Sequence, residues 1–294
     1  MSIHQERKKL NIYISKKKTK KMLLILFLLF LISFQMILCS QKKRKRRFEN
    51  FFISSLTPVP PLTPTKISFL SSENILPILL SEKDNFFKTF FDYDLFARQS
   101  KTLEEYFEKI QSSVSSFSEI EKNKLKKCSE ECDKYLMSLG ASFPGFDGVK
   151  ASNIPWKFGR VQGKLYEYGL AHTRFNDLII FSEDSLNNTE LQFTKTLIHE
   201  KIHLYQKQYP DDVQTYLSHN NIAKLKKREY QDYIRANPDL DEWIYKDNKT
   251  GFIFKCEYNS KFPKNILDVK NTNQLFEHPF EKMAVEISNR LRMS

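Results

Sequence analysis

The sequence has few of the residues from which cysteine-based metal and disulfide modules are built. It contains four cysteines in 294 residues. Cys128 and Cys132 lie four residues apart on one face of an expected helix, a spacing that suits neither a mutual disulfide nor a zinc knuckle, and the chain contains no Cys-x-x-Cys pair. The sequence therefore gives no support to a zinc-knuckle protein, and we expect buried or free thiols.

An excess of positive charge is also missing from most of the chain, although the net charge is +12. Residues 1–47 contain 14 Lys and Arg against one acidic residue, a balance of +13, which leaves about −1 for residues 48–294. A nucleic-acid-binding domain needs a basic surface to neutralise phosphates. We therefore expect no nucleic-acid partner.

The basic residues of the N-terminal tail (1–21) and of the segment KKRKRR (42–47) flank an uncharged apolar segment, 22–39. Its 18 residues are long enough to cross the hydrocarbon core of a bilayer. A cleaved signal peptide is the alternative, but KKRKRR stands where the small residues of a cleavage site are expected. We therefore expect a single-pass membrane anchor whose basic flanks contact anionic lipid headgroups. Because both flanks are basic, the positive-inside rule selects no orientation.

Composition divides the rest of the chain into three parts, and no internal repeat is present. Residues 40–65 form a basic and proline-rich stalk, because TPVPPLTPT (57–65) disfavours helix. Residues 66–150 have helical periodicity and predict a helical subdomain. Residues 151–294 mix strand-like runs with helical patterns, so the expected fold class is α+β. The expected helices of this part are 190–208, 213–236 and 279–292, and the expected strands lie within 164–182 and 251–258.

The segment LIHEKIHLYQ (197–206) places His199, Glu200 and His203 in the spacing H-E-x-x-H. Residues four apart share a helix face, so two imidazoles point at one site and the carboxylate lies beside them. A catalytic zinc ion keeps an open position for water and lowers its pKa, and a nearby carboxylate can take the water's proton. We therefore expect His199 and His203 to bind one zinc ion, with Glu200 as general base.

The residues around the motif predict that this helix is buried. Apolar side chains form two strips on either side of the histidines, and these are Phe193, Leu197 and Leu204, and Ile198, Ile202 and Tyr205. Buried imidazoles need partners, and a shared metal ion supplies one to both. The alternative is an ordinary helix with two hydrogen-bonded histidines.

The expected third ligand comes from the C-terminal segment FEHPFEKMAVEISNRL (276–291). Pro279 is placed to start a helix. On this helix Glu281 lies at the edge of the apolar stripe beside two small residues, Ala284 and Ser288, so its carboxylate can approach a metal ion closely. Glu281 is the preferred ligand. Glu277 and His278 are the alternatives.

These motifs resemble the gluzincin metallopeptidases, in which an H-E-x-x-H helix supplies two zinc ligands and a later helix supplies a glutamate. The resemblance covers roughly residues 166–294. It implies a zincin-like domain that hydrolyses peptide bonds of a peptide or protein substrate, with one zinc ion on His199, His203 and Glu281. It also implies an antiparallel edge strand before the motif helix, at GLAHTRFNDLIIFS (169–182).

The chain also departs from this family. The gap from His203 to Glu281 is 78 residues, and Val285 stands where an aspartate is often found four residues after the glutamate. The outer partner of the ligands is therefore unassigned. The metzincin pattern is excluded, because it would need glycine at Gln206 and histidine at Tyr209.

Transition-state stabilisation needs a donor aimed at the developing oxyanion. The candidates are His172 and Arg174 on the expected edge strand, and Tyr233 and Tyr245 beyond the motif helix, and the sequence does not rank them.

Taken together, the sequence predicts a membrane-anchored zinc metallopeptidase. Two other protein classes remain open. One is a non-catalytic binding protein with the zincin fold, and the other is a membrane-tethered helical adaptor in which the motif is accidental. The sequence specifies neither the substrate nor the oligomeric state.

Overall fold

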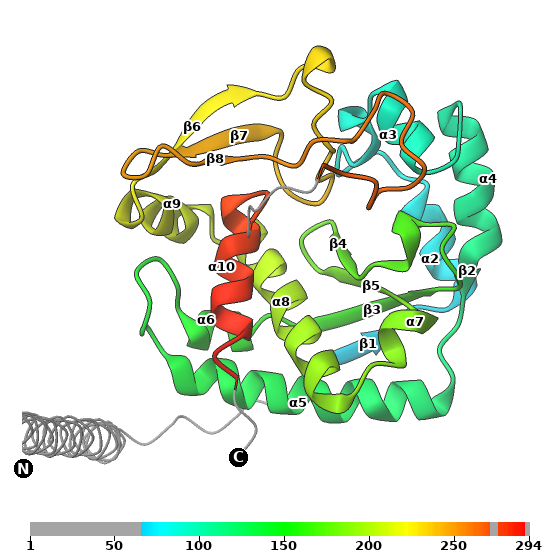
Figure 1. Ribbon diagram of the computed structural model, residues 1–294. Coiled ribbons are helices and arrows are strands. Elements are labelled where there is room, and N and C mark those ends of the chain that lie inside the picture. The colour runs from blue at the N-terminus through cyan, green and yellow to red at the C-terminus, as the bar shows by residue number, and fades with distance from the viewer. Residues whose placement is uncertain (1–65, 271–275, 292–294) are drawn as a thin grey trace, which may run out of the picture. The chain divides into compact units, whose positions relative to one another are not determined.

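The computed structural model describes residues 66–270 and 276–291 of the chain (Figure 1). The predicted tail, anchor (22–39) and stalk (40–65) lie outside the described residues. Among the described helices, none combines the length and the apolar composition needed to cross a membrane.

A mixed five-stranded sheet forms the centre of the described chain, in the order β1-β3-β5-β4 with β2 paired to β3. Strands β1, β3 and β5 are parallel, β4 is antiparallel to β5 at the sheet edge, and β2 is antiparallel to β3. The strands are β1 (Ile67–Phe69), β2 (Val114–Ser115), β3 (Trp156–Val161), β4 (His172–Arg174) and β5 (Leu178–Ser182).

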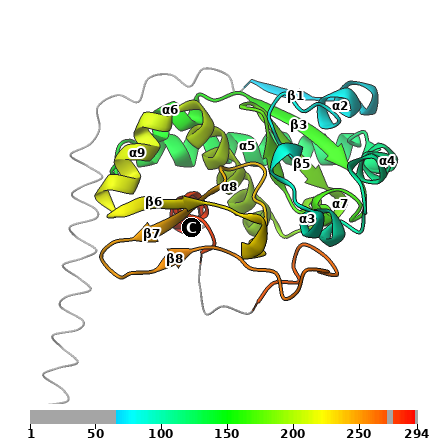
Figure 2. The same ribbon diagram turned by 90° about the horizontal axis from the view of Figure 1, so that it is seen from above.

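Helices cover both faces of this sheet (Figure 2). The helices of the described residues are α2 (Ser72–Leu79), α3 (Asp92–Ala97), α4 (Leu103–Ser113), α5 (Glu119–Leu139), α6 (Gly148–Ser152), α7 (Glu183–Leu186), α8 (Glu190–Gln208), α9 (Pro210–His219) and α10 (Pro279–Ser288). Short 3₁₀ turns are η1 (Phe87–Thr89), η2 (Glu167–Gly169) and η3 (Tyr230–Asp232).

Strand β5 places apolar side chains on both faces of the central sheet, so helices have to cover both faces. Its residues Leu178, Ile179, Ile180 and Phe181 are all fully buried. Successive side chains of a strand point to opposite faces, so Leu178 and Ile180 pack with α2 and α4, and Ile179 and Phe181 pack with α5 and α8. Four consecutive buried apolar residues in one strand therefore require two cores.

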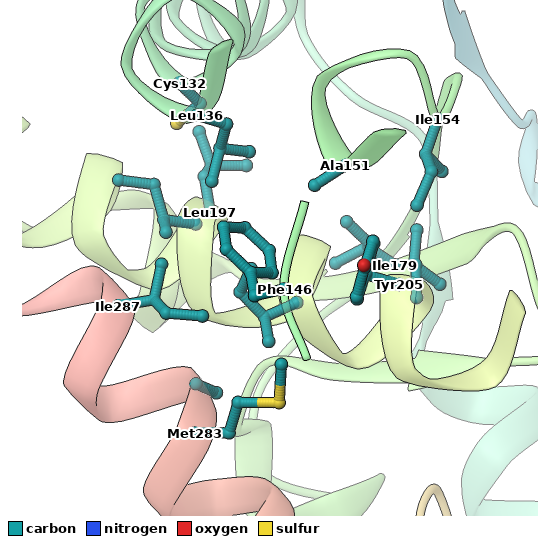
Figure 3. Close-up of a cluster of buried hydrophobic side chains, with 14 of the residues drawn as sticks. Cys132, Leu136, Phe146, Ala151, Ile154, Ile179, Leu197, Tyr205, Met283 and Ile287 are labelled. Carbon is teal, nitrogen blue, oxygen red and sulfur yellow. The ribbon is translucent and has the colours of Figure 1, made fainter. Parts of the chain in front are cut away.

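The larger core joins the sheet to the helices that carry the candidate site. Leu136 of α5, Leu197 of α8, and Met283 and Ile287 of α10 meet in this core (Figure 3). Burying side chains of this size stabilises the folded state by about 1.5–3 kcal/mol each. This packing holds α8 and α10 side by side, as Figure 1 also shows.

Residues 66–150 do not form the separate helical subdomain that the sequence predicts, because two of their segments are strands of the central sheet. β1 and β2 come from this region and both pair with β3, and residues Pro64–Ser294 form one compact unit. These strands are three and two residues long. Such short segments give no recognisable alternation in the sequence, whereas the surrounding helices do.

The predicted helix 213–236 is also wrong. α9 ends at His219, and Asn221 adopts a positive φ of 57° that a helix does not allow. The chain then enters β6 (Ile222–Lys227), which forms a second, antiparallel sheet in the order β6-β7-β8 with β7 (Trp243–Asp247) and β8 (Ile253–Phe254). The polar sequence of β6 has no strand-like alternation because most of its side chains are exposed.

Candidate metal centre

Helix α8 carries the first two candidate ligands and spans the predicted residues, 190–208. The hydroxyl of Thr189 caps it by accepting a hydrogen bond from the N–H of Gln192 at 3.4 Å. The six apolar side chains of its two predicted strips, Phe193, Leu197, Leu204, Ile198, Ile202 and Tyr205, are fully buried. Between these strips His203 is also buried and His199 is half-buried.

Helix α10 brings the third candidate ligand to α8. Pro279 occupies its first turn, and the Nδ1 atom of His278 caps it by accepting a hydrogen bond from the N–H of Phe280 at 3.3 Å. Met283, Ala284 and Ile287 bury one face of α10 in the core. The start of α10 and its buried face together direct Glu281 toward α8.

The three side chains converge. The Nε2 atoms of His199 and His203 are 2.9 Å apart. Glu281 lies against both, with Oε2 3.1 Å from His199 Nε2 and Oε1 3.3 Å from His203 Nε2. One ligand atom from each residue lies within 4.8 Å of the others, and no other group of this kind occurs in the described part of the chain. Two imidazoles and a carboxylate are a donor set that zinc accepts with a fourth position open.

The hydrogen bonds of His203 fit a metal ligand. Its Nδ1 atom lies 2.9 Å from Oε1 of Gln206, which can only accept, so Nδ1 carries the hydrogen. A neutral ring of this tautomer would offer the lone pair of Nε2, the atom that faces His199 and Glu281, to a metal ion. Without a metal ion, burial lowers the pKa of His203, but the Glu281 carboxylate raises it above its usual value. Although burial alone would raise it, the two imidazoles hold the pKa of the Glu281 carboxyl well below its usual range. The carboxylate is therefore ionised, as a ligand must be.

Gln206 joins the two helices that carry the ligands. Its Oε1 faces His203, and its Nε2 donates to the C=O of Phe280 at 3.0 Å, one residue before Glu281. Gln206 is itself buried, at 4% exposed. Outer partners of this kind orient metal ligands and fix their tautomers. Gln206 is thus the candidate for the outer partner that the sequence left unassigned.

We expect Gln206→Met to raise the zinc dissociation constant about 10–100-fold, the usual cost of losing an outer-shell partner. Methionine keeps the volume but leaves the Nδ1–H of His203 and the C=O of Phe280 without their bonds. Competition against a chromophoric chelator measures this constant. Gln208→Met, at an exposed position on the same helix, is the control and should leave it unchanged. Equal zinc affinity in both variants would remove Gln206 from this role.

Glu200 lies beside the candidate ligands in an environment that favours proton uptake. It is 4% exposed, and its Oε2 has no hydrogen-bond partner in the described residues. Burial raises the pKa of Glu200 to about 8, helped by the nearby carboxylates Asp239 and Glu281 and opposed by His199. A carboxylate with a pKa near neutrality can both accept and return a proton, which is what a general base in hydrolysis has to do.

These residues open onto a cavity of about 500 Å³. Its lining includes the candidate ligands and Glu200, together with His172, Lys195, Arg235 and Asp239. The cavity lies between α8, the β4 edge of the central sheet and the segment 235–239. It is large enough for several residues of an extended peptide.

The two alternative third ligands are engaged elsewhere. Glu277 is ion-paired with Arg235, and the Nε2 atom of His278 lies 3.1 Å from Oδ1 of Asp241. Since Nδ1 of His278 caps α10, neither ring nitrogen is available to a metal ion. Of the three candidates, the structure brings only Glu281 to the histidines.

Of the four predicted oxyanion donors, only His172 lines the cavity. Arg174 is fully buried and forms an ion pair with Asp84 at 2.6 Å, so it holds the loop after α2 in place. Tyr245 donates to Asp241 at 2.6 Å. Tyr233 is 37% exposed and contacts the ring of Tyr93. The structure therefore does not bring Arg174, Tyr233 or Tyr245 to the cavity of the candidate ligands.

His172 presents a hydrogen-bond acceptor to the cavity, whereas the prediction needs a donor. Its Nδ1 atom lies 3.0 Å from the C=O of Leu170, so Nδ1 carries the hydrogen. Burial lowers the pKa of His172, which keeps the ring neutral. Its Nε2 atom is then an acceptor without a partner in the described residues, and it cannot donate to an oxyanion.

Sequence reasoning missed three residues of this site. Gln206 stands in the motif segment itself, three residues after His203, and that spacing on a helix is a usable signal. Arg235 lies at the end of the region that was predicted as helix, 213–236, and Asp239 follows that region. Nothing in the sequence around them indicates that the chain returns to the cavity there.

Comparison of the chain with protein-family models, with curated proteins and with solved structures found no match.

Proposed function

We propose that this protein is a membrane-anchored, zinc-dependent peptidase with a zincin-like domain. The observation that carries the proposal is the convergence of His199, His203 and Glu281 beside a buried carboxylate, Glu200, on the wall of a cavity. A structural metal site would be closed and would not need such a base. The sequence segment 22–39 supports the anchor, and release of the full chain from membranes by an alkaline wash would contradict it.

Different residues of the chain would have different roles in hydrolysis. Zinc, when bound, supplies a water molecule of lowered pKa. Glu200 would accept a proton from a water molecule as the water oxygen attacks the carbonyl carbon of the substrate. Glu200 then passes the proton to the amide nitrogen as the C–N bond breaks, so that one water yields a carboxyl and an amino product. His199, His203 and Glu281 would hold the ion, and Gln206 would orient His203.

The native full chain, purified in detergent, should contain about one zinc ion per molecule and should cleave unmodified peptides. Elemental analysis and mass spectrometry of a peptide mixture measure these two properties. Removal of zinc by a chelator should stop cleavage, and added zinc should restore it. Zinc without cleavage would indicate a binding protein, and absence of stoichiometric zinc would indicate an accidental motif.

A further inference from the structure

The edge strand β4 is closed to further pairing at Thr173. The N–H of Thr173 donates to Oδ2 of Asp239 at 3.4 Å, and its C=O accepts from Nζ of Lys207 at 3.3 Å. Side chains therefore occupy both backbone groups through which β4 would bind a neighbouring strand at this residue. An extended peptide that lay along β4 in the cavity would end at Thr173.

Asp239 stands where two cavities meet. The cavity of the candidate ligands and a second cavity of about 480 Å³ share Phe86, Pro238 and Asp239 in their linings. Thr173 and Lys207 line the second cavity only. Thr173, Asp239 and Lys207 together form a barrier at the edge of β4. On the side of the candidate metal ligands, a peptide would therefore meet the carboxylate of Asp239, and not the ammonium of Lys207.

The wall near Asp239 offers hydrogen-bond acceptors. Nε2 of His172 is an acceptor that is buried without a partner in the described residues. Oδ2 of Asp239 accepts from Thr173, and its Oδ1 has no partner among the described residues. Since buried acceptors need donors, the matching ligand group carries several N–H bonds and a positive charge.

A cationic residue of the lining, Lys195, lies farther along α8 on the other side of the candidate ligands. Lys195 lies one turn of α8 before His199, whereas Lys207 and the adjoining barrier lie one turn after His203. A peptide whose amino end met Asp239 would therefore extend past the candidate metal ligands toward a cation. The charge along the cavity matches the polarity of a peptide chain that enters with its amino end toward Asp239.

We propose that Asp239, with His172, binds a primary ammonium group of the substrate, so that the enzyme cleaves close to that group. This inference rests on the proposed peptidase function. The α-ammonium of a peptide and the side chain of a lysine share this chemistry. The barrier at Thr173 favours the α-ammonium, because an extended chain ends there, and the enzyme would then remove residues from the amino end of its substrate.

One peptide mixture in three forms tests this proposal: unmodified, acetylated at the α-amines only, and acetylated at the lysines only. With the native full chain we expect α-acetylation to lower kcat/KM about 10–100-fold, since a charge-assisted hydrogen bond is lost. Lysine acetylation should have little effect, and the products should have lost residues from the amino end. A large effect of lysine acetylation alone would assign the ammonium to a lysine side chain.

Asp239→Asn should bring the ratio of kcat/KM between the unmodified and α-acetylated forms close to one, because asparagine keeps the shape but removes the charge. Asp184→Asn, at an exposed aspartate on α7, should leave the ratio unchanged. Zinc content and circular dichroism establish that both variants fold. Equal cleavage of all three forms by the native chain would overturn the ammonium site but not the peptidase. Absence of cleavage of every form would overturn both.

Discussion

Glu200→Gln should leave zinc bound and lower kcat/KM for peptide cleavage by about 10²–10⁴-fold, the usual contribution of a general base. Glutamine has nearly the same shape, so the buried position beside His199 stays filled, but its amide cannot take a proton from water. Because Glu200 is not one of the three converging ligands, the zinc content should remain near one per molecule.

The control for this variant is Glu183→Gln, at an exposed glutamate on α7. It should retain full activity and zinc. A Glu200→Gln protein that cleaves peptides at the native rate would exclude Glu200 as the base. Loss of zinc in the same variant would instead make Glu200 part of the coordination.

Glu281→Ala should raise the zinc dissociation constant by more than about 100-fold, since even an outer partner contributes 10–100-fold. It removes the carboxylate that lies 3.1 Å and 3.3 Å from the two imidazoles. Cleavage at low zinc concentration should be lost with the metal, and elemental analysis after dialysis measures the loss.

Glu286→Ala is the matched control on the same helix. Glu286 accepts a hydrogen bond from Tyr216 at 2.9 Å and lies outside the candidate centre. This variant should therefore keep its zinc, even if it loses some stability. Full zinc occupancy in Glu281→Ala would show that α10 supplies no ligand and would require a different coordination.

The candidate ligand set was predictable from the sequence because each part of it is local. The spacing of His199 and His203 depends on one helix alone. The apolar strips beside them predict that this helix is buried, and the structure buries these strips. Glu281 followed from its position at the edge of an apolar stripe, and the structure brings it to both histidines. Periodicity within a single helix is the strongest signal that a sequence carries.

The surroundings of the ligands were not predictable, because they depend on contacts between distant segments. Lys201 lies within the motif and reads as a surface residue, yet it is fully buried. Its ammonium lies 3.0 Å from Oδ1 of Asp133 on α5 and over the ring of Trp156 on β3. A charged residue of this kind becomes tolerable in the core only when such partners are in place.

The same reasoning explains the errors around the second sheet. The segment after α9 was predicted as helix, whereas it turns at Asn221 and forms β6. The barrier residue Asp239 lies between β6 and β7 in the chain. Because β6 was predicted as helix, nothing in the sequence indicated that Asp239 approaches β4. Tertiary pairing overrode local propensity in this region.

The arrangement of α8 and α10 has a consequence for how the fold is held together. His203 and Glu281 are 78 residues apart, and the strands β6, β7 and β8 all lie between them in the chain. A metal ion bound to both helices would act as a cross-link that closes this long loop. Its binding free energy would then be part of the folding free energy of the second sheet as well as of the centre itself. Loss of the ion would weaken a strand far from any ligand.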